Sequence, residues 1–544
     1  MDDRDQPYAH VQPAGEVVEE VIGHEVVGEA GGKTIEVSPG RIVPGWLVLA
    51  LVCVGQFMVV LDISIVNVAL PSIQGDLRFT TSGLQWVVNA YTLTFGGFLL
   101  LGGRAADLFG RRRVFLVGLG AFSLASLVGG SAQSQAMLIG ARAFQGLGAA
   151  ILAPATLTML TTSFSEGAAR ARALGVWSAV ASAGASAGAL LGGVLTDLLS
   201  WRWILFVNVP IGVLALVAAR RFLPESRAEA SERHLDLVGA VAVTGGLVAL
   251  VYAIVRTQTS SWSSPQTLGI LALALVLFAA FLLTEARWAR VPLVPLRIFR
   301  SRSVAAGNVV MLLLFAALFG SWYFETLYMQ RVLGYSPLRA GLAFLPQTVL
   351  IAGGAQLTSR LVTRIGTRPL IVVGSLVSAI GLAWLSRIAP GSSFTSDILG
   401  PFVLIGFGMG IAVTPITVAG TEGVPREDAG LASGLLNTSR TVGAAVGLAA
   451  LATLAADRTT SALSGVATTH ARLASALTDG YSLALIVGAI VLLAAAGAAA
   501  ATLRPPRRLE QTVRSPAEPL HGLGGMEGSP QPEAGVEAEV LRSA

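Results

Sequence analysis

The chain of 544 residues is 53% hydrophobic and only 13% charged, about half the charged share of a typical soluble domain. This composition excludes a soluble globular protein, and we expect lipid to surround most of the surface. The single cysteine, Cys53, excludes a disulfide framework and a thiolate metal site. The five histidines fall in predicted tails and loops, so we expect neither a metal nor a cofactor.

Residues 1–44 are polar and acidic and contain no apolar stretch of the kind found in a signal peptide. We expect a disordered cytoplasmic leader here. The run GGKT at residues 31–34 resembles the end of a phosphate-binding loop, but Val27 stands where that motif needs glycine. We therefore predict no nucleotide-binding domain, and any pumping has to draw on an ion gradient or on a partner.

Fourteen apolar segments follow, each about as long as the roughly 20 residues that a helix needs to cross the hydrocarbon core. Each is short of charge, and short polar turns separate them. We expect transmembrane helices over residues 46–70, 84–103, 114–132, 136–160, 173–195, 203–220, 237–256, 266–284, 303–325, 338–358, 369–387, 398–420, 430–455 and 480–502.

The turns between these segments alternate between arginine-rich and arginine-poor. Because basic residues favour cytoplasmic loops, the pattern places both termini in the cytoplasm and supports an even number of helices. It also accounts for the net charge of +5 without nucleic acid. Two arginine-rich turns resemble each other, at residues 103–114 and 359–370, with Gly110 aligned to Gly366. Eight predicted helices separate them, as in transporters built from two similar bundles.

The first of these turns contains the most specific motif in the chain, with the spacing G-x-x-x-D-x-x-G-R-R. Its residues, Gly103, Asp107, Gly110, Arg111 and Arg112, resemble the loop motif of the major facilitator superfamily. Glycine permits a tight reversal, and an aspartate can pair with arginine or cap a helix amino end. The resemblance implies a latch on the cytoplasmic face that opens during alternating access. An ordinary positive-inside turn is the alternative.

The stretch LDISIVNVALP at residues 61–71 resembles a motif of the fourteen-helix drug:proton antiporter branch of that family. Asp62 lies well inside the predicted hydrocarbon region. Insertion scales assign a charged residue there an unfavourable free energy of about 2.5–3.5 kcal/mol. We expect it to face the bundle interior and to take up and release a proton. A structural acid bonded to a neighbouring helix is the alternative. Asn67 is a candidate substrate or proton contact.

The stretch LIGARAFQGLGAA at residues 138–150 is similar to the family's fourth-helix motif. Arg142 and Gln145 share one helix face with small residues, which predicts a buried arginine. The resemblance implies a role for Arg142 in proton transfer, with Gln145 as a possible contact. The alternative is an arginine that extends to the outer surface.

Glycines repeat along the fifth predicted helix, which should allow close helix packing. The antiporter motif of the family has Gly-Pro where this chain has Gly188 followed by Ala189, so we expect a less kinked helix and weaker support for antiport. The packing glycines are Gly184, Gly188, Gly192 and Gly193.

Two further ionisable residues lie in or near predicted helices. Arg440 lies within the stretch at 430–447, which also resembles this branch, and is a candidate substrate or proton contact. Glu325 closes the ninth predicted helix, where we favour a place at the water interface over a second proton or cation contact. The resemblance covers roughly residues 45–502.

The family resemblance implies an all-α polytopic membrane protein with the major facilitator fold. We expect two six-helix bundles and two extra helices between them, arranged as a leader at 1–44, bundles at 45–224 and 303–502, an inserted pair at 225–302 and a disordered cytoplasmic tail at 503–544.

The implied function is proton-coupled export of amphipathic or cationic small molecules across a bacterial plasma membrane. We expect a monomer that acts on small molecules and protons without nucleic acid, and nothing in the sequence supports a periplasmic adaptor. The alternatives are export or symport of a single metabolite and, more remotely, a membrane-embedded enzyme.

Overall fold

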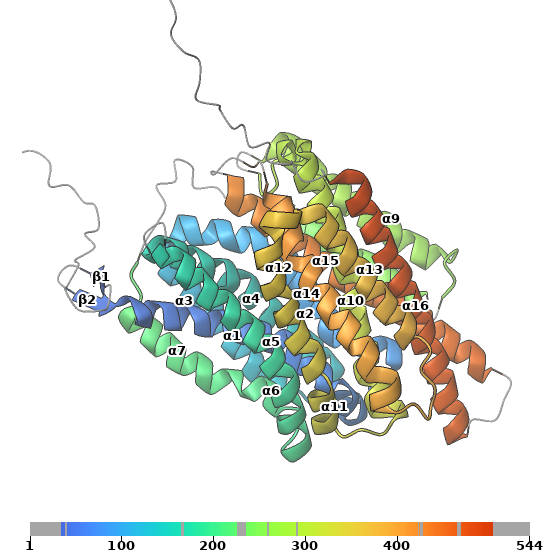
Figure 1. Ribbon diagram of the computed structural model, residues 1–544. Helices are drawn as coiled ribbons and strands as arrows, with labels where there is room; N and C mark the ends of the chain where they lie inside the picture. The colour runs from blue at the N-terminus through green and yellow to red at the C-terminus, as the bar shows by residue number, and fades with distance from the viewer. Residues whose placement is uncertain are drawn as a thin grey trace, which may run out of the picture. The chain divides into compact units, whose positions relative to one another are not determined.

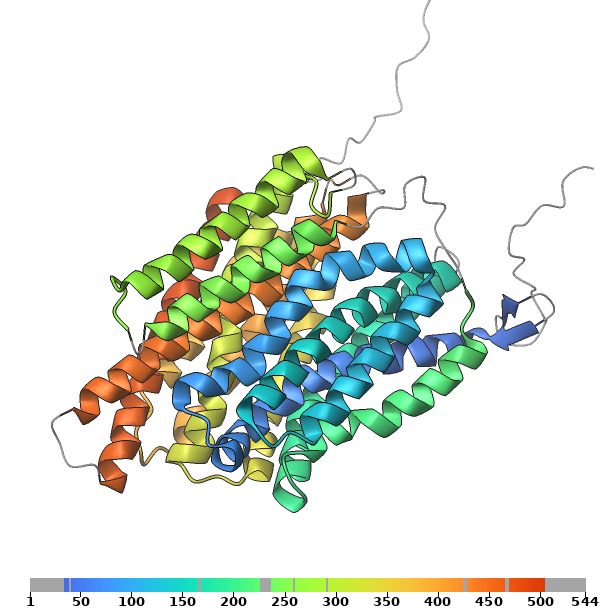
Figure 2. The ribbon, with the colours of Figure 1, turned by 180° about the vertical axis from the view of Figure 1, so that it is seen from behind.

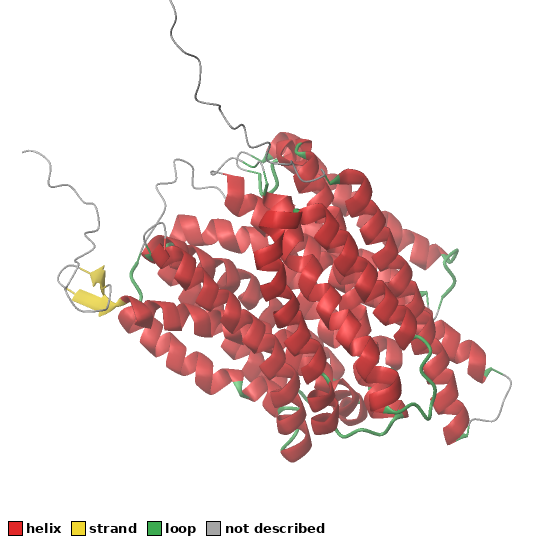
Figure 3. Cartoon of the chain, in the orientation of Figure 1, coloured by secondary structure: helices red, strands yellow, loops and turns green. Residues whose placement is uncertain are grey.

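Helices make up almost all of the computed structural model, which describes residues 34–38, 41–164, 168–225, 236–257, 260–289, 292–422, 424, 428–464 and 469–503 (Figure 3). Within these residues, fourteen helices are long and apolar enough to cross a membrane, and each coincides with one predicted segment. The prediction of fourteen spans is therefore confirmed. The predicted tail at 503–544 lies, apart from Leu503, outside the described residues.

The first six spans pack together as one bundle (Figure 1). The fifth and the sixth join at a short break, because Trp203–Phe206 forms a helical turn of its own before the last helix. The helices are α1 (Gly45–Leu77), α2 (Thr81–Phe109), α3 (Arg111–Gly130), α4 (Gln135–Ser163), α5 (Ala168–Leu198), α6 (Trp203–Phe206) and α7 (Asn208–Phe222).

The last six spans form the second bundle, in which two helices are extended by short π-helical turns, η3 and η4. The elements are η2 (Leu296–Arg300), α10 (Arg302–Leu327), η3 (Tyr328–Val332), α11 (Pro337–Ala343), α12 (Leu345–Ile365), α13 (Thr367–Leu385), η4 (Phe394–Ile398), α14 (Leu399–Thr421), α15 (Ala429–Leu463) and α16 (His470–Thr502).

The inserted pair, α8 (Leu237–Arg256) and α9 (Pro265–Leu283, continued by η1, Thr284–Trp288), lies to one side of both bundles (Figure 2). Helix α8 packs against α2 of the first bundle and α15 of the second. A Cβ atom at Gly97 would lie 2.1 Å from the Thr244 hydroxyl oxygen, so only glycine lets α2 and α8 approach this closely. The pair therefore covers the seam where α2 meets α15.

The two turns that resemble each other in sequence also have the same backbone geometry. Gly110, between α2 and α3, has φ 100°, and Gly366, between α12 and α13, has φ 85°. Residues other than glycine rarely adopt such positive φ values. The shared geometry supports the interpretation that the two bundles are repeats of one unit.

Residues 34–44, which we expected to be disordered, contain a small hairpin. Strand β1 (Thr34–Ser38) pairs antiparallel with β2 (Arg41–Pro44), with Ile35 opposite Val43 (Figure 3). The prediction is wrong for this segment because it rested on the acidic composition and overlooked the alternating apolar residues. Residues 1–33 lie outside the described part of the chain.

Besides the seam between α2 and α15, the bundles meet at the ends of their helices that face the arginine-poor turns. A Cβ atom at Gly341 on α11 would lie 2.5 Å from the carbonyl oxygen of Ala189 on α5. Nearby, the Gln330 amide donates a 2.7 Å hydrogen bond to the carbonyl oxygen of Val68. We call this region the arginine-poor end, and in this structure it is closed.

Candidate functional site

Small residues on α4 bring three helices close enough to enclose the predicted polar residues. A Cβ atom at Gly146 would lie 2.2 Å from the Thr94 hydroxyl oxygen on α2, and one at Gly148 would lie 2.7 Å from the Phe122 amide nitrogen on α3. The Thr94 hydroxyl also donates a 2.8 Å hydrogen bond to the carbonyl oxygen of Ala143. Arg142 and Gln145 are therefore held in the narrow space between α1, α2 and α3.

An ion pair between Asp62 and Arg142 is the centre of this site. One guanidinium nitrogen, Nη1, lies 2.5 Å from Asp62 Oδ2, and the two side chains are 0% and 2% exposed. The same nitrogen donates to Gln145 Oε1 at 2.7 Å, while Gln145 Nε2 donates to Asp62 Oδ1 at 2.7 Å. The acid and the base predicted from separate motifs therefore form one closed triad with Gln145.

The arginine is also fixed from the side of α2. Its Nε donates a 3.0 Å hydrogen bond to the carbonyl oxygen of Val87. The centre of its guanidinium lies 4.4 Å from the centroid of the Tyr91 ring, within the range of a cation–π contact. Arg142 is thus buried and paired, and the alternative that it extends to the outer surface is wrong.

Two further polar residues complete the network, and sequence reasoning did not assign them a role. Asn208, at the start of α7, donates to Asp62 Oδ1 at 3.4 Å, and the Ser126 hydroxyl on α3 accepts from Gln145 Nε2 at 2.7 Å. Asn208 is a polar residue within the apolar run WRWILFVNVPIG, a signal that could have identified it. Four helices besides α2 therefore contribute to a buried cluster whose two charges balance.

The glycines of α5 have two different partners. A Cβ atom at Gly188 would lie 2.6 Å from the Ser64 Cβ, and one at Gly192 would lie 2.7 Å from the Ile65 carbonyl oxygen, both on α1. Gly193 instead meets the second bundle, since its Cβ would lie 2.6 Å from the carbonyl oxygen of Pro337. The close packing extends toward the other end of α5 through Gly184, which lies against Phe57.

Ala189 on α5 stands where the family's antiporter motif has proline. Helix α5 runs unbroken through Ala189. The carbonyl oxygen of Ala185, which a proline at position 189 would leave without its helical donor, accepts a 2.6 Å hydrogen bond from the Ser64 hydroxyl. The less kinked α5 stays a prediction, since α1 and α4 also run unbroken through Pro71 and Pro154.

Toward the arginine-rich end, one position on α5 and one on α12 have open space beside them. Gly175 on α5 and Gly353 on α12 have no heavy atom of a neighbouring element within 4 Å of where a Cβ would be. The Asp62–Arg142 pair therefore lies in a protein whose bundles are closed on each other at the arginine-poor end. The bundles also touch along α2 and α15, where a Cβ atom at Gly434 would lie 2.6 Å from the Leu100 side chain.

The predicted latch between α2 and α3 is described only in part. Arg112 donates a 2.8 Å hydrogen bond to the carbonyl oxygen of Arg220 at the end of α7, and Gly110 provides the positive φ. A Cβ atom at Gly103 would lie 3.5 Å from the Pro154 Cβ, and Arg111 is partly buried. The side chain of Asp107 lies outside the described residues, so its pairing stays a prediction.

The remaining candidates lie apart from the triad. Asn67 donates only to the carbonyl oxygen of Ile63 in its own helix, at 3.2 Å. Arg440 is partly buried, and its guanidinium lies 5.6 Å from the centroid of the Phe315 ring. Glu325 is 2% exposed, so its expected place at the water interface is wrong. The helical path continues past the predicted boundary to Val332, so Glu325 lies within the helix and is covered by neighbouring side chains.

The sequence matches the Major Facilitator Superfamily over residues 52–448. It is 46% identical to a cephamycin export protein of Amycolatopsis lactamdurans, covering 84% of this chain and 93% of that protein. It is 41% identical to a puromycin resistance protein of Streptomyces alboniger, covering 82% and 89%. A solved bacterial homologue of the human lysosomal transporter Spinster shares the fold with a TM-score of 0.58 at 15% identity, covering 84% of this chain and 96% of that one. With its buried triad, its paired bundles and these relatives, the chain belongs to the Major Facilitator Superfamily, as a fourteen-span membrane transporter of the kind found in bacterial antibiotic export.

Proposed function

We propose that this chain exports small amphipathic or cationic antibiotics from a bacterial cell in exchange for protons, by alternating access. The observation that carries this proposal is the fully buried triad of Asp62, Arg142 and Gln145 in the first bundle. Ionisable residues inside a membrane protein commonly mark proton or substrate pathways. The export and resistance functions of the relatives support the substrate class.

The triad can link proton binding to helix movement. A proton on either carboxyl oxygen of Asp62 removes the charge that attracts Arg142 and leaves the guanidinium to Gln145, Val87 and the Tyr91 ring. The contact between α1 and α4 then weakens, because its strongest bond is a charge-assisted one. Loss of the proton restores the pair and the approach of the two helices.

The arginine-rich turns face the cytoplasm in this proposal. Since the arginine-poor end is closed, substrate enters from the cytoplasmic side in this proposal. Arg440, on the second bundle, is a candidate substrate contact, and Gly110 and Arg112 form part of the cytoplasmic latch. The chain works as a monomer and is not an enzyme.

A resistance assay tests the proposal. Wild type, Asp62→Asn and Arg142→Ala would be expressed in an efflux-deficient bacterium and challenged with puromycin and a cephamycin, with membrane levels measured for each variant. We expect both variants to reach the membrane and to lose resistance. Asp197→Asn, which changes an exposed acid on α5, is the matched control and should retain resistance. Unchanged resistance in Asp62→Asn would remove that residue from the mechanism.

Purified protein in proteoliposomes tests the coupling itself. Puromycin transport should rise with an imposed pH difference and fall when an ionophore collapses it. Transport that proceeds equally well without the pH difference would contradict proton exchange.

One observation favours a second candidate, the transport of a single metabolite, by export or by symport. Ala189 replaces the proline of the family's antiporter motif, and α5 is unbroken there. Profiling the metabolites retained by a deletion strain separates the candidates, since a narrow profile with no antibiotic sensitivity would favour the single-metabolite function.

A further inference from the structure

Glu325 is a buried acid in the second bundle, away from the triad. It lies 23 residues after the start of α10, which at about 1.5 Å per residue places it roughly 35 Å along the helix, near the arginine-poor end. Its side chain is 2% exposed. Neither of its carboxyl oxygens has a hydrogen-bond partner within the described residues.

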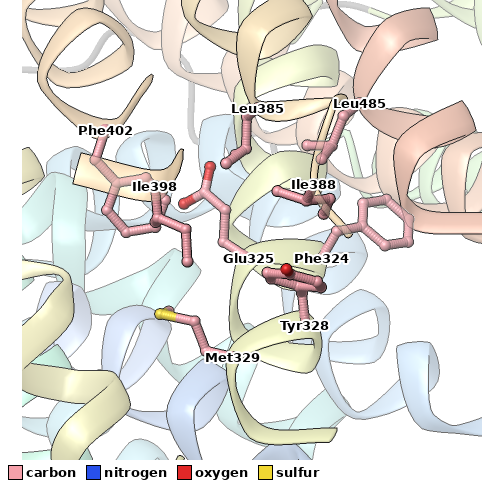
Figure 4. Close-up of a pocket in the computed structure, with 9 residues that line it drawn as sticks. All are labelled: Phe324, Glu325, Tyr328, Met329, Leu385, Ile388, Ile398, Phe402 and Leu485. Carbon is pink, nitrogen blue, oxygen red and sulfur yellow. The ribbon is translucent and has the colours of Figure 1, made fainter. Parts of the chain in front are cut away.

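The carboxyl group faces a small, almost wholly apolar cavity. Figure 4 shows it pointing toward Leu385. The cavity measures about 10 Å³, close to the least that one water molecule requires and far too little for an antibiotic. Apart from Glu325, the lining consists of Phe324, Tyr328, Met329, Leu385, Ile388, Ile398, Phe402 and Leu485.

The polar neighbours of this group do not balance a negative charge. Ser321 and Gln347 lie beside the carboxyl. The Ser321 hydroxyl donates to the carbonyl oxygen of Leu318 at 2.8 Å instead. The Tyr328 hydroxyl donates to the carbonyl oxygen of Ala389 at 2.6 Å.

No charged residue of the surrounding elements pairs with Glu325 within the described residues. None of them lines the cavity. Arg331 on η3 lies by Tyr323 and Tyr481. On η4, the Asp397 carboxylate accepts a 2.7 Å hydrogen bond from the Ser393 amide. At the start of α16, Asp479 pairs at 4.0 Å with Arg458 of α15, and both are more than half exposed.

We infer that Glu325 is a second proton-binding site and that closing the arginine-poor end takes up one proton there. An ionised carboxylate without a cation is strongly disfavoured in an apolar cavity, even beside the neutral amide of Gln347, whereas the neutral acid is tolerated. When this end opens, water reaches the carboxyl, its O–H bond breaks and the proton passes to water. The inference rests on the proposed alternating access and adds a proton to it.

The direction of the pH effect follows from this linkage. Because the closed state binds one more proton than the open state, lowering the pH favours closure. The ratio of closed to open protein should change by up to about tenfold per pH unit, over the range in which the acid is neutral in one state and ionised in the other.

A distance measurement between the bundles tests the inference without any substrate. Spin labels would be attached to Leu198→Cys on α5 and Leu342→Cys on α11, both exposed, in a Cys53→Ala background that removes the one native cysteine. The proportions of short and long distances would be recorded in lipid nanodiscs from pH 5 to pH 8. Asp62 is left unchanged in these labelled proteins.

Three variants decide the outcome. Glu325→Gln, a neutral side chain of the same shape, should favour the closed state, and the slope of closure against pH should fall by about one proton. Glu325→Asp should retain the pH dependence. Glu422→Gln, which neutralises an exposed acid at the end of α14, is the matched control and should behave as wild type.

An unchanged slope in Glu325→Gln overturns the inference, and so does a Glu325→Gln protein that fails to fold, because a neutral isostere should replace a protonated acid. Infrared difference spectra between wild type and Glu325→Gln at pH 7 should show the C=O band of a protonated acid, and carboxylate bands would contradict the proposal. Repeating the distance measurement in Asp62→Asn separates the two proton sites, since the Glu325 contribution should persist there even if the proposed role of Asp62 fails.

Discussion

Replacing Asp62 and replacing Arg142 should each lower the free energy of unfolding, but only the second loss should depend on pH. Replacing Asp62 by asparagine leaves the Arg142 guanidinium buried without its carboxylate, and a guanidinium cannot lose its proton in a protein. Breaking a buried pair in this way typically costs about 3–5 kcal/mol of unfolding free energy. We expect a cost of this size for Asp62→Asn at both pH 5 and pH 7.

Replacing Arg142 by methionine leaves a carboxylate, which can escape its buried charge by binding a proton. For an aspartate with the ordinary pKa of about 3.9, each pH unit above that value adds about 1.4 kcal/mol to the cost of protonation, or about 4 kcal/mol at pH 7. The same cost is about 1.5 kcal/mol at pH 5. The destabilisation by Arg142→Met should therefore shrink by about 2.7 kcal/mol between pH 7 and pH 5.

Unfolding of detergent-solubilised protein by denaturant at the two pH values measures both effects. The double variant Asp62→Asn/Arg142→Met should be more stable than the sum of the single losses indicates, because it leaves no unpaired charge. Equal pH dependence in the two single variants would refute the reasoning, as would a double variant whose losses simply add.

Three further substitutions test other parts of the structure. Gly193→Val should separate labels at the arginine-poor end and reduce resistance, because even its Cβ would lie 2.6 Å from the Pro337 carbonyl oxygen. Gly110→Ala should lower the unfolding free energy by about 1–2 kcal/mol, since φ is 100° there. Arg440→Gln should raise thermal stability but lower antibiotic resistance, because it removes an intramembrane charge that has no ion pair within the described residues.

Controls on the same helices separate these effects from general disruption. Gly175→Val, at a position of α5 where a Cβ would have no neighbour within 4 Å, should leave the label distance and the resistance unchanged. Gly366→Ala, at the repeated turn, should destabilise as much as Gly110→Ala. A thermal stability of Arg440→Gln below that of wild type would show that the arginine supports the fold instead.

The number and the approximate limits of the spans could be predicted from the sequence because they depend on local properties. A run of about 20 apolar residues requires a helix in lipid, since no water satisfies the backbone there. The prediction failed where a helix continued beyond its apolar core, as at Glu325, because hydropathy does not report how far a helix extends past the hydrocarbon. It also failed at the hairpin of residues 34–44, where the prediction followed the acidic composition and overlooked the alternation of apolar residues.

The pairing of residues far apart in the chain depended on the tertiary structure. The sequence placed Asp62 and Arg142 within spans, but their contact across 80 positions depends on how closely glycine lets α4 approach α2 and α3. Likewise, only the packing of the helices determined that Asn208 contacts Asp62 and that Gly193 contacts Pro337 on α11. Apolar periodicity and loop charge determine that helices cross the membrane and in which direction, whereas the side-chain shapes along each seam determine which helices touch and which polar groups are enclosed together.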